Sequence, residues 1–194
     1  MKGKLGRHLF HMVGGCFPPV IGLVLPREWT LLFLGSLAAI FVGGEFLRFT
    51  VEPVNRRLTS LVSRISTGFK EGEGARPIGT TYYLVASFLV FVFSSTDVAM
   101  AALFIAAVGD AIAALAGERY GRTRLGTKSL EGTGAFFASA LVIGAVLILA
   151  GFRLSWLAVT VGAAAAALVE LLPIPIDDNL TVPIAGAAAM ALLL

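Results

Sequence analysis

Long apolar runs are the feature that most constrains how this chain can fold. Seven of them, separated by polar segments, account for most of the 194 residues. They span residues 8–25, 30–47, 80–95, 98–117, 133–151, 154–172 and 180–194. A helix needs about 20 apolar residues to cross the hydrocarbon core of a bilayer. The runs therefore predict an all-α, polytopic membrane helix bundle with about seven transmembrane helices.

Composition supports the same prediction. Hydrophobic residues make up 57% of the chain and charged residues 14%, whereas a soluble domain has about 45–50% and about 25%. The length suits one membrane-embedded domain over residues 1–194. The single cysteine, Cys16, excludes an intrachain disulfide framework and a cysteine metal cluster. The basic residues before the first run resemble a signal peptide, but no small-residue cleavage site follows, so we expect a first transmembrane helix there.

The distribution of positive charge predicts the orientation. If the N-terminus lies inside, 13 of the 15 lysine and arginine residues fall in inner segments, and only Arg27 and Arg153 fall outside. Such an excess marks the cytoplasmic side, so we expect a cytoplasmic N-terminus and an external C-terminus. The basic side, in a chain of net charge +3, favours contact with lipid headgroups or a polyphosphate. A nucleic-acid partner is not expected for a chain this apolar.

The longest inner segment has a pattern of its own. Apolar residues recur with a helical period between residues 51 and 69. This pattern predicts an amphipathic helix in the cytoplasmic interface or packed over the bundle, and a solvated connector is the alternative. A flexible loop is expected over residues 70–79.

Acidic residues point to a functional site on the inner side. Ten of the twelve fall there, and six lie within or against apolar runs: Glu45, Asp110, Glu131, Glu170, Asp177 and Asp178. An ionisable group at the centre of a membrane helix costs about 2.5–3.5 kcal/mol on insertion scales. Each acid alone has a structural alternative, such as capping a helix or pairing with arginine. Their convergence on one face favours a shared site.

Residues 109–137 are the densest stretch. Small residues recur every four positions, at Gly109, Ala113, Gly117 and Gly121, and form a stripe that another backbone or a ligand can approach closely. A glycine-punctuated basic loop follows and leads into the next apolar run.

The "GTKSLEG" segment at the end of that loop suggests phosphate chemistry. A helix N-terminus favours anions, Lys128 supplies positive charge, and nearby carboxylates such as Asp110 and Glu131 can bind a magnesium ion shared with phosphates. The alternative is a plain basic loop in which Lys128 and Glu131 form a surface pair.

The segment "PIPIDDN" breaks one helix at its prolines. Asp178 or Asn179 is expected to cap the next helix, and Asp177 is expected to be the less essential acid.

The stretch "GDAIAALAGERYGRTRLGTKSLEG" resembles the signature of the family of dolichol kinase, phytol kinase and CTP-dependent diacylglycerol kinase. "GRHLFHMVGG" is similar to its N-terminal motif through Arg7, His11 and Gly15, and "ELLPIPIDDNLTVP" to its late motif. The chain departs from the family at His8, where lysine is common. The family is distantly similar to CDP-diacylglycerol synthases, but here Lys128 precedes a serine and no proline stands before it.

The resemblance implies an integral membrane kinase that transfers the γ-phosphate of CTP, with ATP possible, to a lipid alcohol in the presence of Mg²⁺. The expected catalytic residues are Asp110, Lys128, Glu131 and Asp178, and the metal ligands among them are Asp110, Glu131 and Asp178. The expected nucleotide contacts are Gly109, Gly117, Gly121, Arg122, Arg124, Lys128, Ser129, Gly132 and Asn179. The expected substrate contacts are Arg7, His11, Glu45 and Glu170. Two alternatives remain open: a cytidylyltransferase that joins CMP to a lipid phosphate, and a small transporter or scramblase, although the chain shows no inverted repeat.

Overall fold

The computed structural model describes residues 2–53, 55 and 77–194, and this part of the chain is almost entirely helical. The expected all-α fold is confirmed. The helices are α1 (Lys2–Gly15), α2 (Phe17–Val24), α3 (Arg27–Thr50), α5 (Gly79–Phe93), α6 (Thr96–Tyr120), α7 (Leu130–Leu149), α8 (Trp156–Leu171) and α9 (Asp178–Ala191). A short hairpin of β1 (Arg124–Leu125) and β2 (Lys128–Ser129) joins α6 to α7.

Three of the described helices, α3, α6 and α7, are long and apolar enough to cross a membrane, and α5 and α8 are shorter apolar helices. The number of spanning helices and their orientation stay predictions. The first apolar run differs from its expected form, because it is two helices rather than one. The chain breaks at Cys16, and Pro18 and Pro19 open α2, where their missing N–H groups leave no bond unmade.

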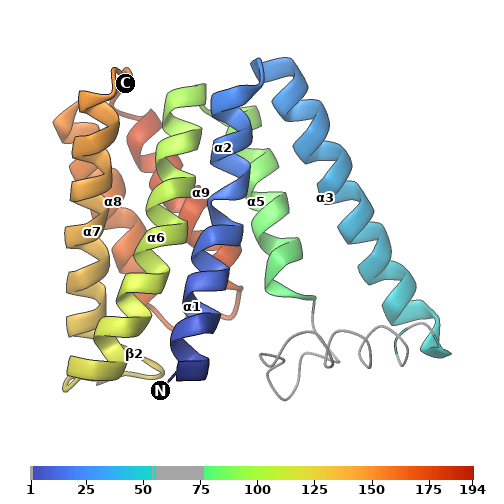
Figure 1. Ribbon diagram of the computed structural model, residues 1–194, viewed down its shortest axis with the longest axis horizontal. Coiled ribbons are helices and arrows are strands. Elements are labelled where there is room, and N and C mark those ends of the chain that lie inside the picture. The colour runs from blue at the N-terminus through green and yellow to red at the C-terminus, as the bar shows by residue number, and fades with distance from the viewer. Residues whose placement is uncertain (1, 54, 56–76) are drawn as a thin grey trace.

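Helix α6 is the centre of the bundle (Figure 1). It packs against α1, α2, α5, α7, α8 and α9. In its most apolar stretch 61% of the residues are buried, compared with 22% in α3, which packs mainly against α5. Residues on α6 are therefore reached from several neighbouring helices, and a polar side chain there can meet polar side chains from each of them.

The stripe of small residues on α6 is covered by α7. A Cβ at Gly109 would come within 2.7 Å of the Phe136 ring, and a Cβ at Gly132 would come within 2.8 Å of the Ala113 carbonyl oxygen. The close approach expected at this stripe is thus made by another helix backbone, as small residues allow. Helix packing accounts for Gly109 and Gly132, and their contact with a nucleotide remains a prediction.

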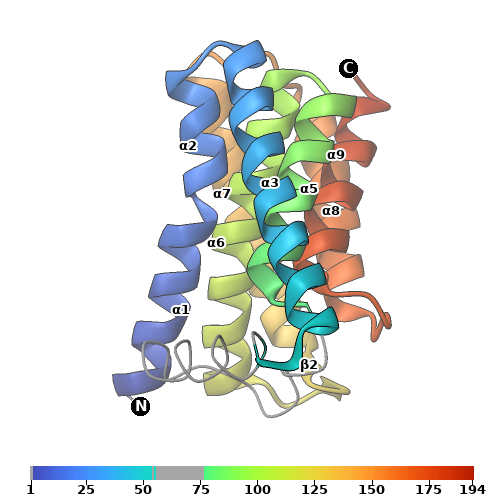
Figure 2. The ribbon, with the colours of Figure 1, turned by 90° about the vertical axis from the view of Figure 1, so that its right-hand side faces the viewer.

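The two ends of the bundle are distinct in both views (Figures 1 and 2). The start of α1 and the β1–β2 hairpin lie at one end, here called the hairpin end. The α2–α3 turn and the C-terminus lie at the other, here called the far end. The amphipathic helix and the loop predicted between residues 51 and 79 fall almost entirely outside the described residues.

Candidate functional site

The predicted basic loop after α6 is a tight hairpin. Arg124 pairs with Ser129 and Leu125 with Lys128, and Gly126 turns the chain at φ +62°. A two-residue turn with a left-handed glycine in first position matches the twist of paired strands. Lys128 is therefore fixed on a strand directly before α7, whereas the guanidinium-bearing Arg122 and Arg124 are exposed on the hairpin.

Ser129 locks this hairpin onto α6. Its hydroxyl caps α7 by accepting a hydrogen bond from the Gly132 N–H at 3.1 Å. A Cβ at Gly117 or at Gly121 would come within 2.9 Å of that hydroxyl oxygen. The buried serine and the glycines form a close structural contact, which explains their residue types without a ligand. A role for them in nucleotide binding stays a prediction.

Lys128 is the centre of a cluster of charged side chains from three helices. Its Nζ lies 2.7 Å from Glu170 Oε1, 2.8 Å from Asp178 Oδ2 and 3.7 Å from Asp110 Oδ1. We call these four residues the lysine cluster. Asp110 belongs to α6, Glu170 to α8 and Asp178 to the first turn of α9. Residues that are up to 68 positions apart in the chain thus meet around one ammonium group.

The lysine cluster is closed at one side and open at the other. The side chain of Glu170 is 4% exposed and that of Lys128 is 27% exposed, but Asp178 and Asp110 are 43% and 53% exposed. Three carboxylates face one ammonium, so the ionised cluster carries excess negative charge. Its open side is made by two carboxylates, which suits the entry of a cation or of a group that brings one.

The pKa of Lys128 is raised above its ordinary value. Burial disfavours the ammonium and lowers the pKa, but the charges of Asp178 and Asp110 and the hydrogen bonds to Asp178 and Glu170 outweigh it. The side chain is therefore a cation at neutral pH, in the state needed to neutralise a phosphate.

Thr133 completes the closed side, and the sequence analysis did not single it out. Its hydroxyl lies 3.2 Å from Glu170 Oε2 and 3.1 Å from the Ser129 carbonyl oxygen, one turn back on α7. Both oxygens of Glu170 are thus in contact, one with Lys128 and one with Thr133. Glu170 is predicted to contact the substrate, but in the structure its side chain is enclosed by protein groups. The only sequence signal was a hydroxyl residue one helical turn after Ser129.

Glu131 is not part of the lysine cluster. Its two oxygens lie 3.1 Å and 3.3 Å from the Thr123 backbone nitrogen, which donates to them across the base of the hairpin. No ion pair joins Glu131 to Lys128, although both lie in the described part of the chain, so the surface pair of the alternative reading does not form. The structure brings Asp110 and Asp178 together, but not Glu131 with them.

The start of α9 differs from the expectation. Asp177, not Asp178 or Asn179, caps the helix: its Oδ1 accepts from the Asn179 backbone N–H at 3.0 Å and from the Asn179 side-chain amide at 2.8 Å. Because Asp177 satisfies the exposed N–H groups, Asp178 is left to bind Lys128. Asn179 also packs against Gly79, where a Cβ would come within 2.8 Å of its Nδ2.

Glu45, a residue of α3, has a similar structural role because it binds the start of α5. It is buried, forms an ion pair with Arg48 at 2.7 Å, and accepts hydrogen bonds from the Ile78 N–H at 2.8 Å and the Thr81 hydroxyl at 3.3 Å. It therefore ties α3 to the N-terminus of α5. These contacts explain its burial, and a contact with substrate stays a prediction.

Helix α1 brings two histidines to α6. His11 is exposed, and its helix packs against α6, which carries Asp110. His8 Nε2 lies 3.5 Å from Glu118 Oε1. The position where this chain departs from the resembled family is therefore a contact between α1 and α6. Arg7, the other expected contact on α1, is half-buried.

The donor groups suit a metal that is shared with phosphate rather than a complete protein cage. Within the described residues, no group of three or more histidine, cysteine, aspartate or glutamate side chains is arranged to hold a metal ion. Mg²⁺ commonly binds proteins through one or two carboxylates and takes its other oxygens from water and phosphates. Asp110 and Asp178, both partly exposed and both within 4 Å of Lys128 Nζ, meet that smaller requirement.

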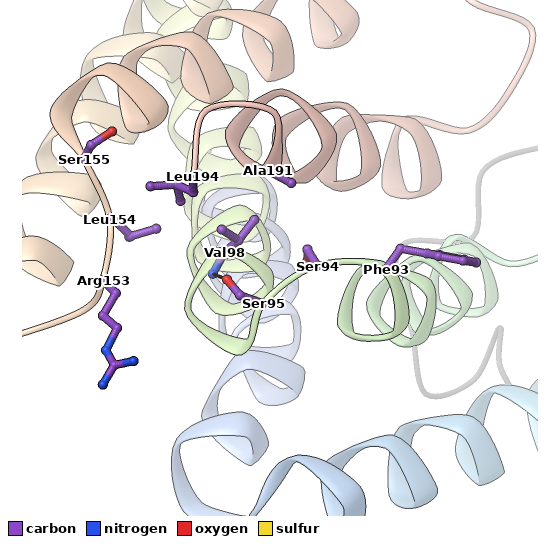
Figure 3. Close-up of a pocket in the computed structure, with 9 residues that line it drawn as sticks. All are labelled: Phe93, Ser94, Ser95, Val98, Arg153, Leu154, Ser155, Ala191 and Leu194. Carbon is purple, nitrogen blue, oxygen red and sulfur yellow. Dashed lines mark hydrogen bonds between the residues drawn. The ribbon is translucent and has the colours of Figure 1, made fainter.

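A separate pocket of about 730 Å³ opens at the far end (Figure 3). Its lining includes Val98, Leu154 and Leu194, with three serine residues at the rim. The guanidinium of Arg153 is turned away from the other lining residues. Two of the serines, Ser95 and Ser155, use their hydroxyls to cap α6 and α8. The pocket is thus at the opposite end of the bundle from the lysine cluster.

Comparison with known proteins finds a similar sequence in a bacterium. The chain is 26% identical over 182 residues to an uncharacterized protein of Rickettsia prowazekii (strain Madrid E), which covers 92% of this chain and 88% of that protein. No family model matches the chain, and no solved structure matches it. The similarity extends along nearly all of both chains.

Proposed function

We propose that this chain is an integral membrane lipid-alcohol kinase that transfers the γ-phosphate of a nucleotide to the hydroxyl of a membrane lipid. CTP as the donor, with ATP as the alternative, and a polyprenol, phytol-like or diacylglycerol acceptor follow from the resemblance alone. The observation that carries the proposal is the lysine cluster: one ammonium among three carboxylates, open on one side, at the end of an apolar helix bundle.

Phosphoryl transfer depends mainly on positioning and on neutralising charge. Lys128 would bind the phosphate oxygens through its ammonium. An open carboxylate of the cluster, on Asp110 or Asp178, would accept the proton of the lipid hydroxyl as its oxygen bonds to the γ-phosphorus. The bond between that phosphorus and the bridging oxygen breaks, and the nucleoside diphosphate leaves. Phosphate, proton and leaving group are then all accounted for at one site.

Asp110 and Asp178 are the residues that would hold Mg²⁺ together with the nucleotide. The ion would supply further neutralisation of phosphate charge. Because the open side carries excess negative charge, a divalent cation bound there would reduce the repulsion between the carboxylates and the nucleotide phosphates. The exposed Arg122 and Arg124 of the hairpin are placed to attract the polyphosphate or anionic headgroups from solvent.

The position of the cluster suits a lipid acceptor. A lipid alcohol keeps its hydroxyl near the membrane interface, whereas the nucleotide arrives from water. Exposed apolar side chains on α1 and α3, among them Phe10 and Phe46, face outward from the bundle, as contact with lipid requires. The end of the bundle is where both substrates can meet, and the charge distribution favours the cytoplasmic side for it.

A direct test uses the purified protein in lipid nanodiscs. γ-Labelled CTP or ATP is supplied with Mg²⁺ and a panel of lipid alcohols, and labelled lipid is separated by chromatography. We expect a lipid monophosphate and a nucleoside diphosphate from wild type, no product from Lys128→Ala, and normal product from Arg153→Ala as the matched control at the far end. Incorporation of α-labelled CTP into lipid would instead show the cytidylyltransferase, and absence of any nucleotide turnover would favour a transporter or scramblase.

A further inference from the structure

The closed side of the lysine cluster has a simple organisation. Glu170 is the only one of the three carboxylates that is fully buried, and it makes the shortest contact with Lys128, at 2.7 Å. Its second oxygen lies 3.2 Å from the Thr133 hydroxyl, whose single proton is shared with the Ser129 carbonyl oxygen at 3.1 Å. A buried carboxylate with both oxygens in contact with protein groups is shielded from solvent.

The open carboxylates are different in kind. Asp178 and Asp110 contact the same ammonium, but each is roughly half exposed. Glu170 at 2.7 Å and Asp178 at 2.8 Å use two of the three ammonium donors, while Asp110 at 3.7 Å lies beyond hydrogen-bond distance, so a third donor can meet an incoming phosphate on the open side. Of the three contacts of Lys128, the one with Glu170 is the most shielded from solvent.

We propose that Glu170 and Thr133 are positioning residues that hold the Lys128 ammonium in place while phosphate binds it from the open side. The inference rests on the proposed function and extends it. A lysine side chain is long and flexible, and it can reach a phosphate from many conformations. A fixed counter-ion confines the ammonium to one position, and such positioning of a catalytic group increases the reaction rate. Thr133 acts indirectly, because its hydroxyl contacts the Glu170 carboxylate and not the ammonium.

Matched substitutions test the chain of contacts. Thr133→Ser keeps the hydroxyl, Thr133→Val removes it at nearly constant volume, and Glu170→Gln keeps the shape of the side chain but removes its charge. Misplacement of a catalytic group by about 1 Å can cost about 100-fold in rate. We expect kcat to fall about 100-fold in Glu170→Gln and about tenfold in Thr133→Val, with small changes in the nucleotide KM. Thr133→Ser should remain near wild type.

The double variant separates positioning from general stability. If Thr133 acts through Glu170, adding Thr133→Val to Glu170→Gln costs little further kcat, because coupled residues are not additive. If both residues serve only the fold, the two losses multiply and follow the amount of folded protein recovered. That second result, or a Thr133→Ser variant as impaired as Thr133→Val, would overturn the inference.

A second readout does not depend on catalysis. An amine-acylating reagent is applied to the protein in nanodiscs, and acylation of Lys128 is measured by mass spectrometry relative to Lys2 and Lys4. We expect Lys128 to be protected in wild type and Thr133→Ser, and to react about tenfold faster in Glu170→Gln, as loss of a charge partner predicts. Unchanged protection in Glu170→Gln would overturn the positioning role. Faster acylation in a protein without phosphotransfer would support the positioning role and reject the proposed function.

Discussion

Charged side chains have different partners at the two ends of the bundle. At the far end, Arg27 donates to the Phe91 carbonyl oxygen at 2.6 Å and to the Ser94 carbonyl oxygen at 2.9 Å, and Asp97 accepts from the Arg153 N–H at 2.9 Å. Arg27 thus binds carbonyl groups at the end of α5, and Asp97 binds a backbone N–H of the loop between α7 and α8. At the hairpin end, Lys128 is instead bound by carboxylates from three helices. A charge that binds backbone has a structural explanation, whereas a partly exposed cluster of three carboxylates around one ammonium is a candidate functional site.

The same distinction divides the acids within the hairpin end. Glu45, Glu131 and Asp177 accept hydrogen bonds from backbone N–H groups. The other three acids that lie against apolar runs converge on Lys128. Burial alone does not sort them, because Glu45 and Glu170 are both buried. The partner of each carboxylate is what separates a structural acid from a candidate functional one.

The largest expected difference between the two ends is that they lie on opposite sides of the membrane. In a Cys16→Ser background, a cysteine at Thr127 in the hairpin should react with a membrane-impermeant thiol reagent only from the cytoplasmic side. A cysteine at Leu194 should react only from the other side, as the distribution of lysine and arginine predicts. The measurement is labelling of intact cells compared with inverted vesicles. Labelling of both positions from the same side would remove the basis for a cytoplasmic site.

Substitution of Lys128 should have the largest effect on the reaction. Loss of one group that stabilises developing charge lowers kcat by about 10²–10³-fold in well-studied sites, so we expect Lys128→Ala to lose at least that much. Lys128→Arg should bind nucleotide but turn over slowly, because a planar guanidinium cannot occupy the position of a compact ammonium. Single-turnover transfer at saturating nucleotide measures both. Equal rates for wild type, Arg and Ala would return Lys128 to the role of a basic residue at the membrane surface.

Substitution of the open carboxylate Asp110 should have the next largest effect on turnover. Asp110→Asn removes a charge and a proton acceptor at constant shape, and we expect kcat to fall by about 100-fold or more, as for the loss of a general base. Asp97→Asn is the matched control on the same helix at the far end, and its amide oxygen can still accept from the Arg153 N–H. We expect it to keep wild-type turnover. Near-normal activity in Asp110→Asn would remove Asp110 from the site.

Sequence patterns were sufficient for the helices and for the neighbourhood of the site. Apolar runs depend on residue type alone, so all of them appear as helices, with one break at Cys16 where two prolines follow. The stretch around Lys128 was identified because it is rich in charge in a chain where only 14% of the residues are charged. Tertiary partners could not be read from the same pattern, because Asp110, Glu170 and Asp178 meet Lys128 only when α6, α8 and α9 pack together.

Local backbone geometry was the second feature that could not be predicted from the sequence. Glu131 lies three residues from Lys128 and was expected beside it, but the hairpin turns its carboxylate to Thr123. Thr133 was overlooked because a threonine in the first turn of a helix is ordinary in sequence, and its importance depends on the position of Glu170. A hairpin of two-residue strands has no periodic signal, so the direction of its side chains had to come from the structure.

The smallest predicted effect concerns the adjacent pair Asp177 and Asp178, where the two kinds of charge are neighbours in sequence. Asp177→Ala removes the cap of α9 and should cost about 1 kcal/mol of stability, while Asp177→Asn, a good capping residue, should cost little. Neither should change turnover per folded molecule greatly, because the cap does not touch Lys128. Asp178→Asn should show the reverse pattern, with normal thermal stability in nanodiscs and reduced turnover. Thermal unfolding and single-turnover transfer, measured on the same preparations, make the comparison. If Asp177→Asn and Asp178→Asn lose turnover equally, the partner of a carboxylate does not predict its role in this protein.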